Sequence, residues 1–180
     1  MKKSILLLAL FLSSFSVFSQ DKKITKTGKI TFEASVPAFE EVKSKNESVT
    51  CILNTKTGEI ASLALVKGFR FKIALMEEHF NENYMESDKY PKATFKGKIQ
   101  DFNLSMIGGT AKEFKMKGVM EIHGKSKEIT TTVKLRKIDD AIEVISDFNV
   151  NTEDFDIEIP KVVSKKVSKM VNVKTEFLVK

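Results

Sequence analysis

Apolar and polar residues alternate one by one along most of this chain, and this period of two constrains its fold more than any other feature. In the run from Phe69 to Leu75, apolar side chains fall on one face, and Arg70 and Lys72 fall on the other. The run from Ala93 to Ile99 has the same pattern. Successive side chains of a strand point to opposite faces, so each run predicts a half-buried β-strand. Further runs of this kind cover residues 30–36, 49–54, 60–66, 114–122, 129–135, 142–150 and 171–179.

Turn signals separate these runs, and no segment of ten or more residues keeps a helical period. Gly58, Gly124 and the pair Asp139-Asp140 mark three of the turns. Residues 20–28 are polar and are expected to be frayed. About eight or nine short antiparallel strands indicate a sandwich or a closed barrel. The lysine-rich faces disfavour an outer-membrane barrel, because the outward face of such a barrel must be apolar.

The longest break in the pattern is a polar and aromatic connector from Glu77 to Lys92. A connector of this length inside a compact domain is uncommon unless it carries function or covers something. We expect it to be a short helical connector that covers the space between the strands. The expected fold is therefore all-β, an antiparallel β-barrel of about eight strands. The interior of such a barrel is filled by side chains or holds one small ligand.

The first 19 residues have the features of a cleaved signal peptide. Lys2 and Lys3 precede an apolar segment from Ile5 to Val17, and Ser19 supplies a small residue at the expected cleavage site. A membrane anchor is the competing interpretation, but the apolar segment is short and interrupted by serine. We therefore expect residues 20–180 to form a single domain of a periplasmic or secreted protein that is not transmembrane.

Charge and cysteine content narrow the class of protein further. The net charge is +6, but the lysines are spread along the strands and do not form the basic patches of nucleic-acid-binding proteins. The single cysteine, Cys51, cannot form an internal disulfide. It alternates with Val49 and Leu53 on an apolar face, so we expect a buried, unreactive thiol. The oligomeric state stays open, with a dimer as one option.

The sequence contains no recognisable catalytic motif. It lacks an HExxH helix, a glycine-rich phosphate loop and a GxSxG elbow. Its two histidines, His79 and His123, are expected at the surface. A metal site needs three or four converging ligands, and the glutamates near His79 and the acidic segment 153–158 are more typical of solvated edges. We expect no enzyme, no metal and no cofactor, and a hydrolase that uses either histidine is the weakest alternative.

The apolar residues are more informative than the polar ones. The chain has 14 phenylalanines, seven methionines and no tryptophan, and many of them lie on inward strand faces. Most such residues are simply core. Small residues on the same strands, among them Ala93, Gly97 and Gly118, leave room for an interior that is not completely filled. An apolar cavity with few polar groups suits a chain-shaped lipid.

Six segments follow one another along the chain, namely Phe71-Lys72-Ile73, His79-Phe80, Tyr90-Pro91-Lys92-Ala93-Thr94-Phe95, the hairpin 118–133, Ser146-Asp147-Phe148-Asn149-Val150 and the closing strand 167–179. In this order they resemble the YceI-like family, exported bacterial proteins with a lipocalin-like barrel that bind isoprenoid chains. The resemblance implies this fold and an isoprenoid ligand, and it covers nearly all of residues 20–180. Glu77-Glu78 stands where family members often have Arg-Asp, and Asn149 replaces a glycine.

We therefore expect a protein that holds an apolar polyisoprenoid or fatty chain inside its barrel, for transport or storage. The alternative is an interaction or structural module of the cell envelope, with a filled barrel and no ligand. Arg70, Lys89 and Lys92 are candidates to contact a ligand head group. The residues expected to line the cavity or its gate are Phe69, Phe71, Ile73, His79, Phe80, Tyr84, Tyr90, Phe95, Phe102, Met120, Ile122 and Phe148.

Overall fold

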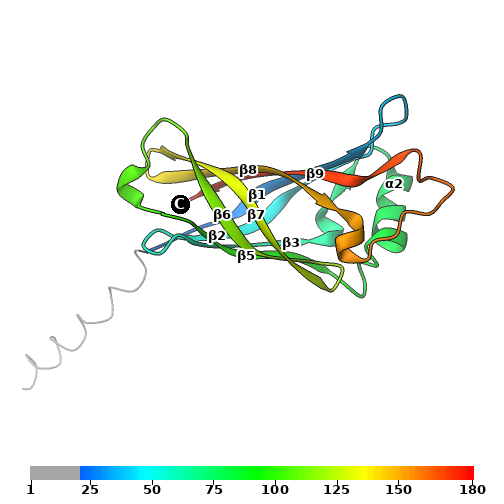
Figure 1. The fold of residues 1–180 in the computed structure, drawn as a ribbon, viewed down its shortest axis with the longest axis horizontal. Coiled ribbons are helices and arrows are strands. Elements are labelled where there is room, and N and C mark those ends of the chain that lie inside the picture. Colours follow the sequence, from blue (N-terminus) through cyan, green and yellow to red (C-terminus); the bar gives the residue numbers. More distant parts are fainter. Residues whose placement is uncertain (1–20) are drawn as a thin grey trace, which may run out of the picture.

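The alternating runs form the wall of a closed antiparallel β-barrel in the computed structural model, which describes residues 21–180 (Figure 1). The expected signal peptide, residues 1–19, lies outside the described residues. A two-residue strand, β4 (Arg70–Phe71), accompanies the barrel. The eight barrel strands are β1 (Lys22–Ser35), β2 (Lys43–Asn54), β3 (Glu59–Leu65), β5 (Lys92–Ile99), β6 (Lys112–Ile122), β7 (Lys125–Ile138), β8 (Ala141–Asn151) and β9 (Val167–Val179).

The sheet runs in the order β1-β9-β8-β7-β6-β5-β3-β2, and β2 then pairs with β1 and closes the barrel. Most neighbours in the sheet are also neighbours in the chain, and short turns connect β2 to β3, β6 to β7 and β7 to β8. β4 extends the sheet beside the first residues of β2, where Ser44 pairs with Phe71. The prediction of an all-β antiparallel barrel of about eight strands with a short helical connector is confirmed.

The helical parts lie between the strands. Helix α2 (Ala74–His79) continues directly into the π-helical turn η3 (Phe80–Tyr84), and together they form most of the connector before β5. The remaining helical turns are the 3₁₀ segments η2 (Val66–Gly68), η4 (Leu104–Met106) and η5 (Thr152–Phe155). No helix within residues 21–180 has the length and apolar character needed to cross a membrane.

The expectation that residues 20–28 are frayed is wrong for residues 22–28, and Gln20 lies outside the described residues. β1 already begins at Lys22, and this part of it pairs with the end of β2 from Asn54 to Cys51. The Ile24 amide also donates a hydrogen bond to the carbonyl of Lys180, with an N···O distance of 2.9 Å. The segment is polar in composition, but partners on both sides satisfy its backbone groups, and a polar strand is stable under those conditions.

The expectation of a strand from Phe69 to Leu75 is also wrong beyond its first residues. Only Arg70 and Phe71 are extended and paired, and helix α2 begins at Ala74. Leu75, expected to point inward, lies on the helix and is 56% exposed. A run of seven alternating residues fits a strand but also tolerates one short helical turn, and here the tertiary contacts of Glu77 described below favour the helix.

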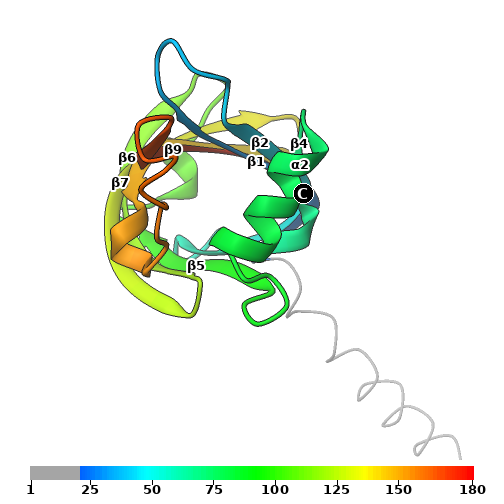
Figure 2. The ribbon, with the colours of Figure 1, turned by 90° about the vertical axis from the view of Figure 1, so that its right-hand side faces the viewer.

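The interior of the barrel has two zones that differ in packing. We call the first the filled end, because its inward side chains are nearly or completely buried against one another. The second, which we call the hollow end, lies where α2, η3, η5 and the segments 36–42 and 156–166 come together (Figure 2). The filled end contains Leu53, Ile99, Phe114, Leu135, Ile142 and Val179.

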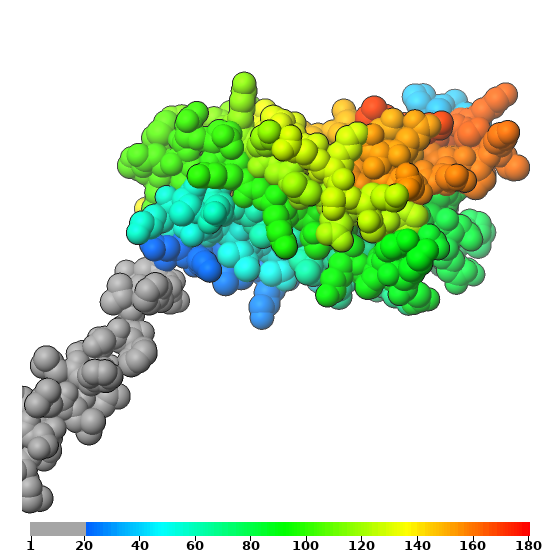
Figure 3. Space-filling model, turned by 60° about the horizontal axis from the view of Figure 1, so that its bottom comes forward, coloured from blue at the N-terminus to red at the C-terminus, as the bar shows by residue number. Residues whose placement is uncertain are grey.

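The outer wall of the barrel is continuous on the side drawn in Figure 3, where side chains of neighbouring strands meet without a visible hollow. Ion pairs between neighbouring strands follow this outer face, for example Lys29 with Glu176 and Lys117 with Glu128. These pairs are solvent-exposed and contribute little to stability. Access to the interior is therefore expected through the hollow end.

Candidate functional site

The hollow end encloses a cavity of about 460 Å³ that extends from the helical connector toward the middle of the barrel. Its lining comes from every barrel strand except β2, and from α2, η3, η5 and the segments beside them. Nearly all lining atoms are apolar. A cavity of this size and character is typical of a site for one small apolar molecule. The barrel is thus not completely filled by its own side chains.

Four phenylalanine rings pack together on one side of this cavity. Phe32 of β1 lies 5.3 Å from Phe80 of η3, ring centre to ring centre, in a stacked arrangement. Phe69 and Phe71 contact both of these rings at centroid distances between 5.1 and 5.8 Å. Aromatic pairs at such distances stabilise each other beyond simple burial. This phenylalanine cluster joins the wall of the barrel to the helical connector.

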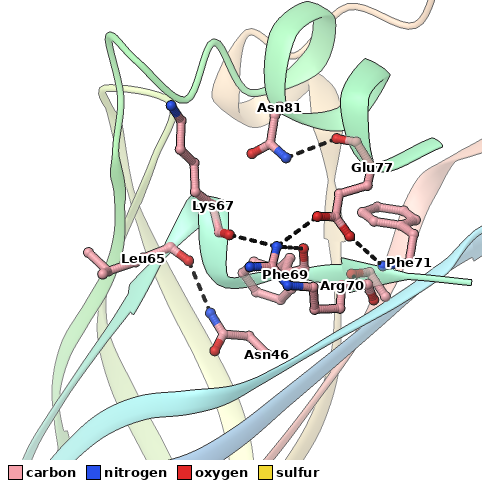
Figure 4. Close-up of polar contacts among 9 residues, drawn as sticks. Asn46, Leu65, Lys67, Phe69, Arg70, Phe71, Glu77 and Asn81 are labelled. Atoms are coloured by element: carbon pink, nitrogen blue, oxygen red, sulfur yellow. Dashed lines mark hydrogen bonds and ion pairs between the residues drawn. The ribbon is translucent and has the colours of Figure 1, made fainter. Parts of the chain in front are cut away.

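An ion pair holds the helical connector against β4 (Figure 4). Arg70 Nη1 donates to Glu77 Oε1 at 2.7 Å, and the Phe71 amide donates to Glu77 Oε2 at 3.1 Å. The Asn81 side chain in turn donates to the Glu77 carbonyl at 2.9 Å. Glu77 therefore ends the extended segment and orients the first turn of α2. This role explains why a carboxylate stands at this position.

A second polar contact supports the strand before the connector. Asn46 of β2 is 1% exposed, and its Nδ2 donates to the carbonyl of Leu65 at 3.0 Å (Figure 4). Its Oδ1 accepts from the Ser48 amide at 2.9 Å. Both ends of this buried amide are satisfied, as a buried polar group requires. The pair positions η2 and Phe69 at the edge of the cavity.

His123 joins three segments around the hollow end, and it is not the simple surface histidine that we expected. Its side chain is only 11% exposed. Nδ1 lies 3.1 Å from the carbonyl of Phe155, and Nε2 lies 2.8 Å from Oε2 of Glu86. The ring also packs edge-on against Tyr90, with centroids 4.6 Å apart. The β6–β7 turn is thereby tied both to η5 and to the end of the connector.

Two phenylalanine rings of the cavity lining occupy the space over glycines of the barrel wall. Phe95 of β5 lies over Gly97 and Gly118, and a Cβ atom added at either glycine would be 2.6 Å from its ring carbon Cζ. Phe177 of β9 lies over Gly28 in the same way, at 2.4 Å. Both rings line the cavity and are nearly buried, at 8% and 4% exposure. The absence of a Cβ atom at these glycines leaves the space that the two rings occupy.

The structure brings nine of the twelve expected site residues to this cavity and places three elsewhere. Ile73 is the N-cap residue of α2, and Tyr90 packs against His123 and over Gly124. Phe102 covers Gly58 beside the filled end. The nine that line the cavity are Phe69, Phe71, His79, Phe80, Tyr84, Phe95, Met120, Ile122 and Phe148.

Several lining residues were not among those expected. Ile30, Phe32 and Ala34 share one alternating face of β1, and this pattern was visible in the sequence. Phe39 and Val163 come from loops, where no periodicity marks them. Their contribution depends on where the two loops fold back, which only the tertiary structure shows.

Among residues 21–180, the charged side chains that line the cavity come from the segments at its mouth. Glu40 and Lys166 contribute to its lining, together with the imidazole of His79. Of the expected head-group candidates, Arg70 is paired with Glu77, and Lys89 contacts Glu86 and the Tyr90 ring. Neither of them, nor Lys92, lines the cavity.

The other expected polar features have structural partners. The acidic segment 153–156 is neutralised by lysines, since Glu153 pairs with Lys169 at 2.6 Å and Asp156 with Lys125 at 2.7 Å. Within residues 21–180, no group of three or more His, Cys, Asp or Glu side chains is arranged to hold a metal ion. Cys51 is fully buried, as expected, and burial raises the pKa of its thiol from 9.0 to about 12.

Comparisons with known proteins agree with this architecture. A polyisoprenoid-binding domain from Saccharophagus degradans, implicated in plant cell wall breakdown, has a TM-score of 0.76 and 14% identity, over 89% of this chain and 98% of that one. BcnA from Burkholderia cenocepacia has a TM-score of 0.70 and 14% identity, over 85% and 96%. The Campylobacter jejuni YCEI protein has a TM-score of 0.60 and 16% identity, over 81% and 89%.

At these identities the structural likeness shows the fold alone. No curated protein matches the chain. The sequence model of one family, the YceI-like domain, does match, and it covers residues 13–178. Since this match includes all eight barrel strands and the helical connector between β4 and β5, the chain belongs to the YceI-like domain family.

Proposed function

We propose that this protein binds one apolar, chain-shaped small molecule, polyisoprenoid or fatty, inside the hollow end of its barrel. The observation that carries the proposal is the apolar cavity of about 460 Å³. An empty apolar space of this size inside a packed protein loses dispersion contacts, and an apolar guest restores them. The likeness to a polyisoprenoid-binding domain supports the same ligand class.

In this proposal the protein transports or stores the apolar ligand. It acts outside the cytoplasm, in the periplasm or after secretion. The apolar first segment of the chain supports export. The cavity supports carriage more than catalysis, because nearly all of its lining atoms are apolar. Binding would remove the ligand from water. The ligand would enter and leave through the mouth beside α2 and η3.

The test is to express the full chain, purify the exported protein, extract it with organic solvent and analyse the extract by lipid mass spectrometry. We expect one class of chain lipid at close to one molecule per protein molecule. An extract without lipid, together with no uptake of isoprenoid alcohols or fatty acids by the purified protein, would contradict the proposal.

Two adjacent residues of β3 supply a matched pair of variants. Ser62 lines the cavity and Ala61 does not. Ser62→Phe places a large ring in the cavity and is expected to lower the bound lipid at least tenfold. Ala61→Phe adds the same ring outside the cavity and is expected to leave the lipid content unchanged. Equal loss in both variants would mean that the lipid is bound on the surface.

A further inference from the structure

We propose that the barrel opens sideways at its hollow end, along a seam between residues 125–132 of β7 and residues 147–151 of β8, when η5 moves away. This opening widens the mouth while a ligand enters or leaves. The proposal rests on the proposed function, to which it adds the part of the barrel that moves.

The register of the strands defines the seam. β7 pairs with β8 only from Val133 to Ile138. Toward the hollow end, residues 125–132 of β7 pair with β6, and residues 147–151 of β8 pair with β9. Among residues 21–180, neither segment has a strand partner on its other side. The two facing edges therefore lack the ladder of hydrogen bonds that holds paired strands together.

The closed end of the seam is marked by a side-chain contact. Ser146 belongs to the last pair between the two strands, and its hydroxyl donates to the carbonyl of Thr132 at 2.6 Å. Ser146 is 3% exposed, so this contact is shielded from water. We expect the two strands to stay joined up to this point when the seam opens.

The seam runs along the cavity. Continued past its last pair, the register would place Ile129 opposite Val150. Both residues line the cavity, and so does Phe148 on the same face of β8. Because these side chains stand at the edges of the seam, separation of the edges widens the cavity at its mouth.

The helical turn η5 covers the seam. It follows β8 directly and also contacts β7, and Figure 2 shows it in orange against the hairpin of β6 and β7. Its residue Phe155 lines the cavity and is 1% exposed. Withdrawal of this ring would open the cavity on the side of the seam.

Ion pairs on the surface bridge the seam from η5 to β7. Asp154 pairs with Lys127, and Asp156, directly after η5, pairs with Lys125 at 2.7 Å. All four side chains are partly exposed to solvent. Ion pairs in such positions contribute little to stability and weaken with salt. They can therefore hold η5 in place and still release it at low cost.

The backbone of η5 adds few contacts with the barrel. The amides of Asp156 and Ile157 donate back to carbonyls of η5 itself. The Phe155 carbonyl lies 3.1 Å from Nδ1 of His123 in the turn between β6 and β7. A segment with mainly internal backbone bonds can move as a unit without breaking the sheet.

The hydroxyl of Thr152, at the start of η5, favours the opening. Thr152 is 9% exposed, and within the described part of the chain its Oγ1 is buried without a hydrogen-bond partner. A buried unpaired hydroxyl is costly, and water would satisfy it once η5 has moved. The closed position of η5 is therefore less stable than its apolar contacts alone would make it.

The main experiment links η5 to β7 in the full-length gene product after export, stripped of lipid. Lys127→Cys and Asp154→Cys, in a Cys51→Ala background, are bridged with bismaleimidoethane. Uptake and release of a dansyl-labelled fatty acid are followed by stopped-flow fluorescence. We expect the bridge to slow both rates roughly tenfold or more, relative to the same variant treated with N-ethylmaleimide.

The matched control bridges two strands that are fully paired. Lys29 of β1 lies opposite Glu176 of β9, and Lys29→Cys with Glu176→Cys, bridged in the same way, is expected to change the rates less than about twofold. Unchanged rates after bridging residues 127 and 154 would overturn the proposal. Equal slowing by both bridges would also overturn it, since the seam would then have no special role.

Removal of the ion pairs is expected to have the opposite effect. One exposed ion pair changes an equilibrium by up to about fivefold. Asp154→Asn with Asp156→Asn is therefore expected to speed release about three- to tenfold. Glu113→Gln removes an ion pair with Lys134 on the outer wall and is expected to leave release unchanged. Unchanged release in the double variant would contradict the role of the ion pairs.

Hydrogen exchange tests the opening without any ligand. Thr152→Val keeps the shape of the side chain and removes the unpaired hydroxyl, so η5 should open less often. Exchange of the Ile157 amide, which donates to the Thr152 carbonyl, is expected to slow about threefold or more. Thr175→Val, at another threonine of the lining, is the control and should leave this exchange unchanged. Unchanged or faster exchange in Thr152→Val would count against the opening.

The outcomes separate the two proposals. If the unbridged protein takes up no prenyl alcohol and no fatty acid, the proposed function fails, and the role of the seam in ligand passage fails with it. If the unbridged protein takes up lipid and the bridge between residues 127 and 154 changes neither rate, the proposed function stands and the seam is not the moving part.

Discussion

The filled end and the hollow end of the barrel are built from the same strands, yet one is close-packed and the other encloses a cavity. On β7, Leu135 at the filled end is 0% exposed, whereas Ile129 at the hollow end is only partly buried and lines the cavity. The alternation of apolar residues is equally regular in both places. The difference therefore does not come from the alternation pattern, and the segments that cover each end contribute to it.

Short turns and the segment around η4 cover the filled end. Ile107, directly after η4, is 6% exposed and belongs to the core, and Phe102 lies over Gly58 in the β2–β3 turn. The hollow end is covered by α2 and η3, which contribute no buried residue, and by loops and η5, where Phe155 is 1% exposed. A cover that buries few of its own side chains is held by a small number of contacts and can open at low cost. The comparison thus assigns stability to the filled end, and it supports the hollow end as the place where the proposed ligand would enter and leave.

The largest expected effect contrasts two core residues of β7. Leu135→Ala removes a fully buried side chain at the filled end, and we expect it to lower the free energy of unfolding by about 2 to 5 kcal/mol. Ile129→Ala, in the wall of the cavity, is expected to lower it by about 1 kcal/mol, because the side chain has fewer neighbours to lose. Denaturant unfolding of the lipid-free protein measures both. Equal losses would mean that the cavity is filled in solution.

The next effect concerns the glycines that the Phe95 ring covers. A Cβ atom at Gly118 would lie 2.5 Å from the backbone oxygen of Lys96, which cannot move without disturbing the strand pairing. We expect Gly118→Ala to destabilise the protein by about 1 to 3 kcal/mol. Gly108 has no atom within 4 Å of an added Cβ, so Gly108→Ala should change stability by less than about 0.5 kcal/mol. A tolerated Gly118→Ala would contradict the close approach of the Phe95 ring and the Lys96 carbonyl to Gly118.

A smaller effect is expected at the cover of the hollow end. Glu77→Gln weakens the contact with Arg70. Because the Arg70 side chain is 63% exposed, the free energy of unfolding should fall by no more than about 1 kcal/mol. The local effect is larger, because the Phe71 amide donates to the same carboxylate. Hydrogen exchange at Phe71 and in α2 should become faster. Glu78→Gln is the control, and equal acceleration in both variants would argue against the role of Glu77.

The smallest effect at neutral pH concerns Cys51, which lies two residues before Leu53 of the filled end. Burial raises its pKa from 9.0 to about 12, so its folded state keeps the proton that the unfolded state loses above pH 9. Stability contributed by this thiol is complete below pH 9 and is lost between pH 9 and about 12. The advantage of the natural protein over Cys51→Ala should shrink in this range when denaturant unfolding is measured at several pH values.

Thiol labelling at pH 8 compares a cysteine near the filled end with a cysteine in the cavity. Cys51 should react with a thiol reagent only after unfolding, since it is 0% exposed and protonated. A cysteine placed in the cavity, Ala93→Cys in a Cys51→Ala background, should react in the folded protein and be protected by bound lipid. Rapid labelling of Cys51 in the folded natural protein would contradict the assignment of a closed filled end.

Much of the fold could be predicted from the sequence. The alternating runs predicted β3, β5, β6, β7, β8 and β9, because a strand with one buried face alternates apolar and polar residues in the sequence. The polar start of β1 has no such pattern, because its stability comes from pairing with the end of β2 and from hydrogen bonds with Lys180. The segment after Phe71 was assigned to a strand because its short alternation could not reveal the contact of Glu77 with Arg70.

By itself the sequence determined an all-β antiparallel barrel with an apolar interior, because the alternation of apolar and polar residues shows which face of each strand is buried. It also pointed to most of the phenylalanines and methionines around the site. Only the tertiary structure decided which end of that interior is filled and which is hollow. The reason is physical: a cavity depends on the distances between strands, on rings such as Phe95 and Phe177 lying over glycines, and on loops folding back over one end. None of these distances is encoded in the pattern of a single strand.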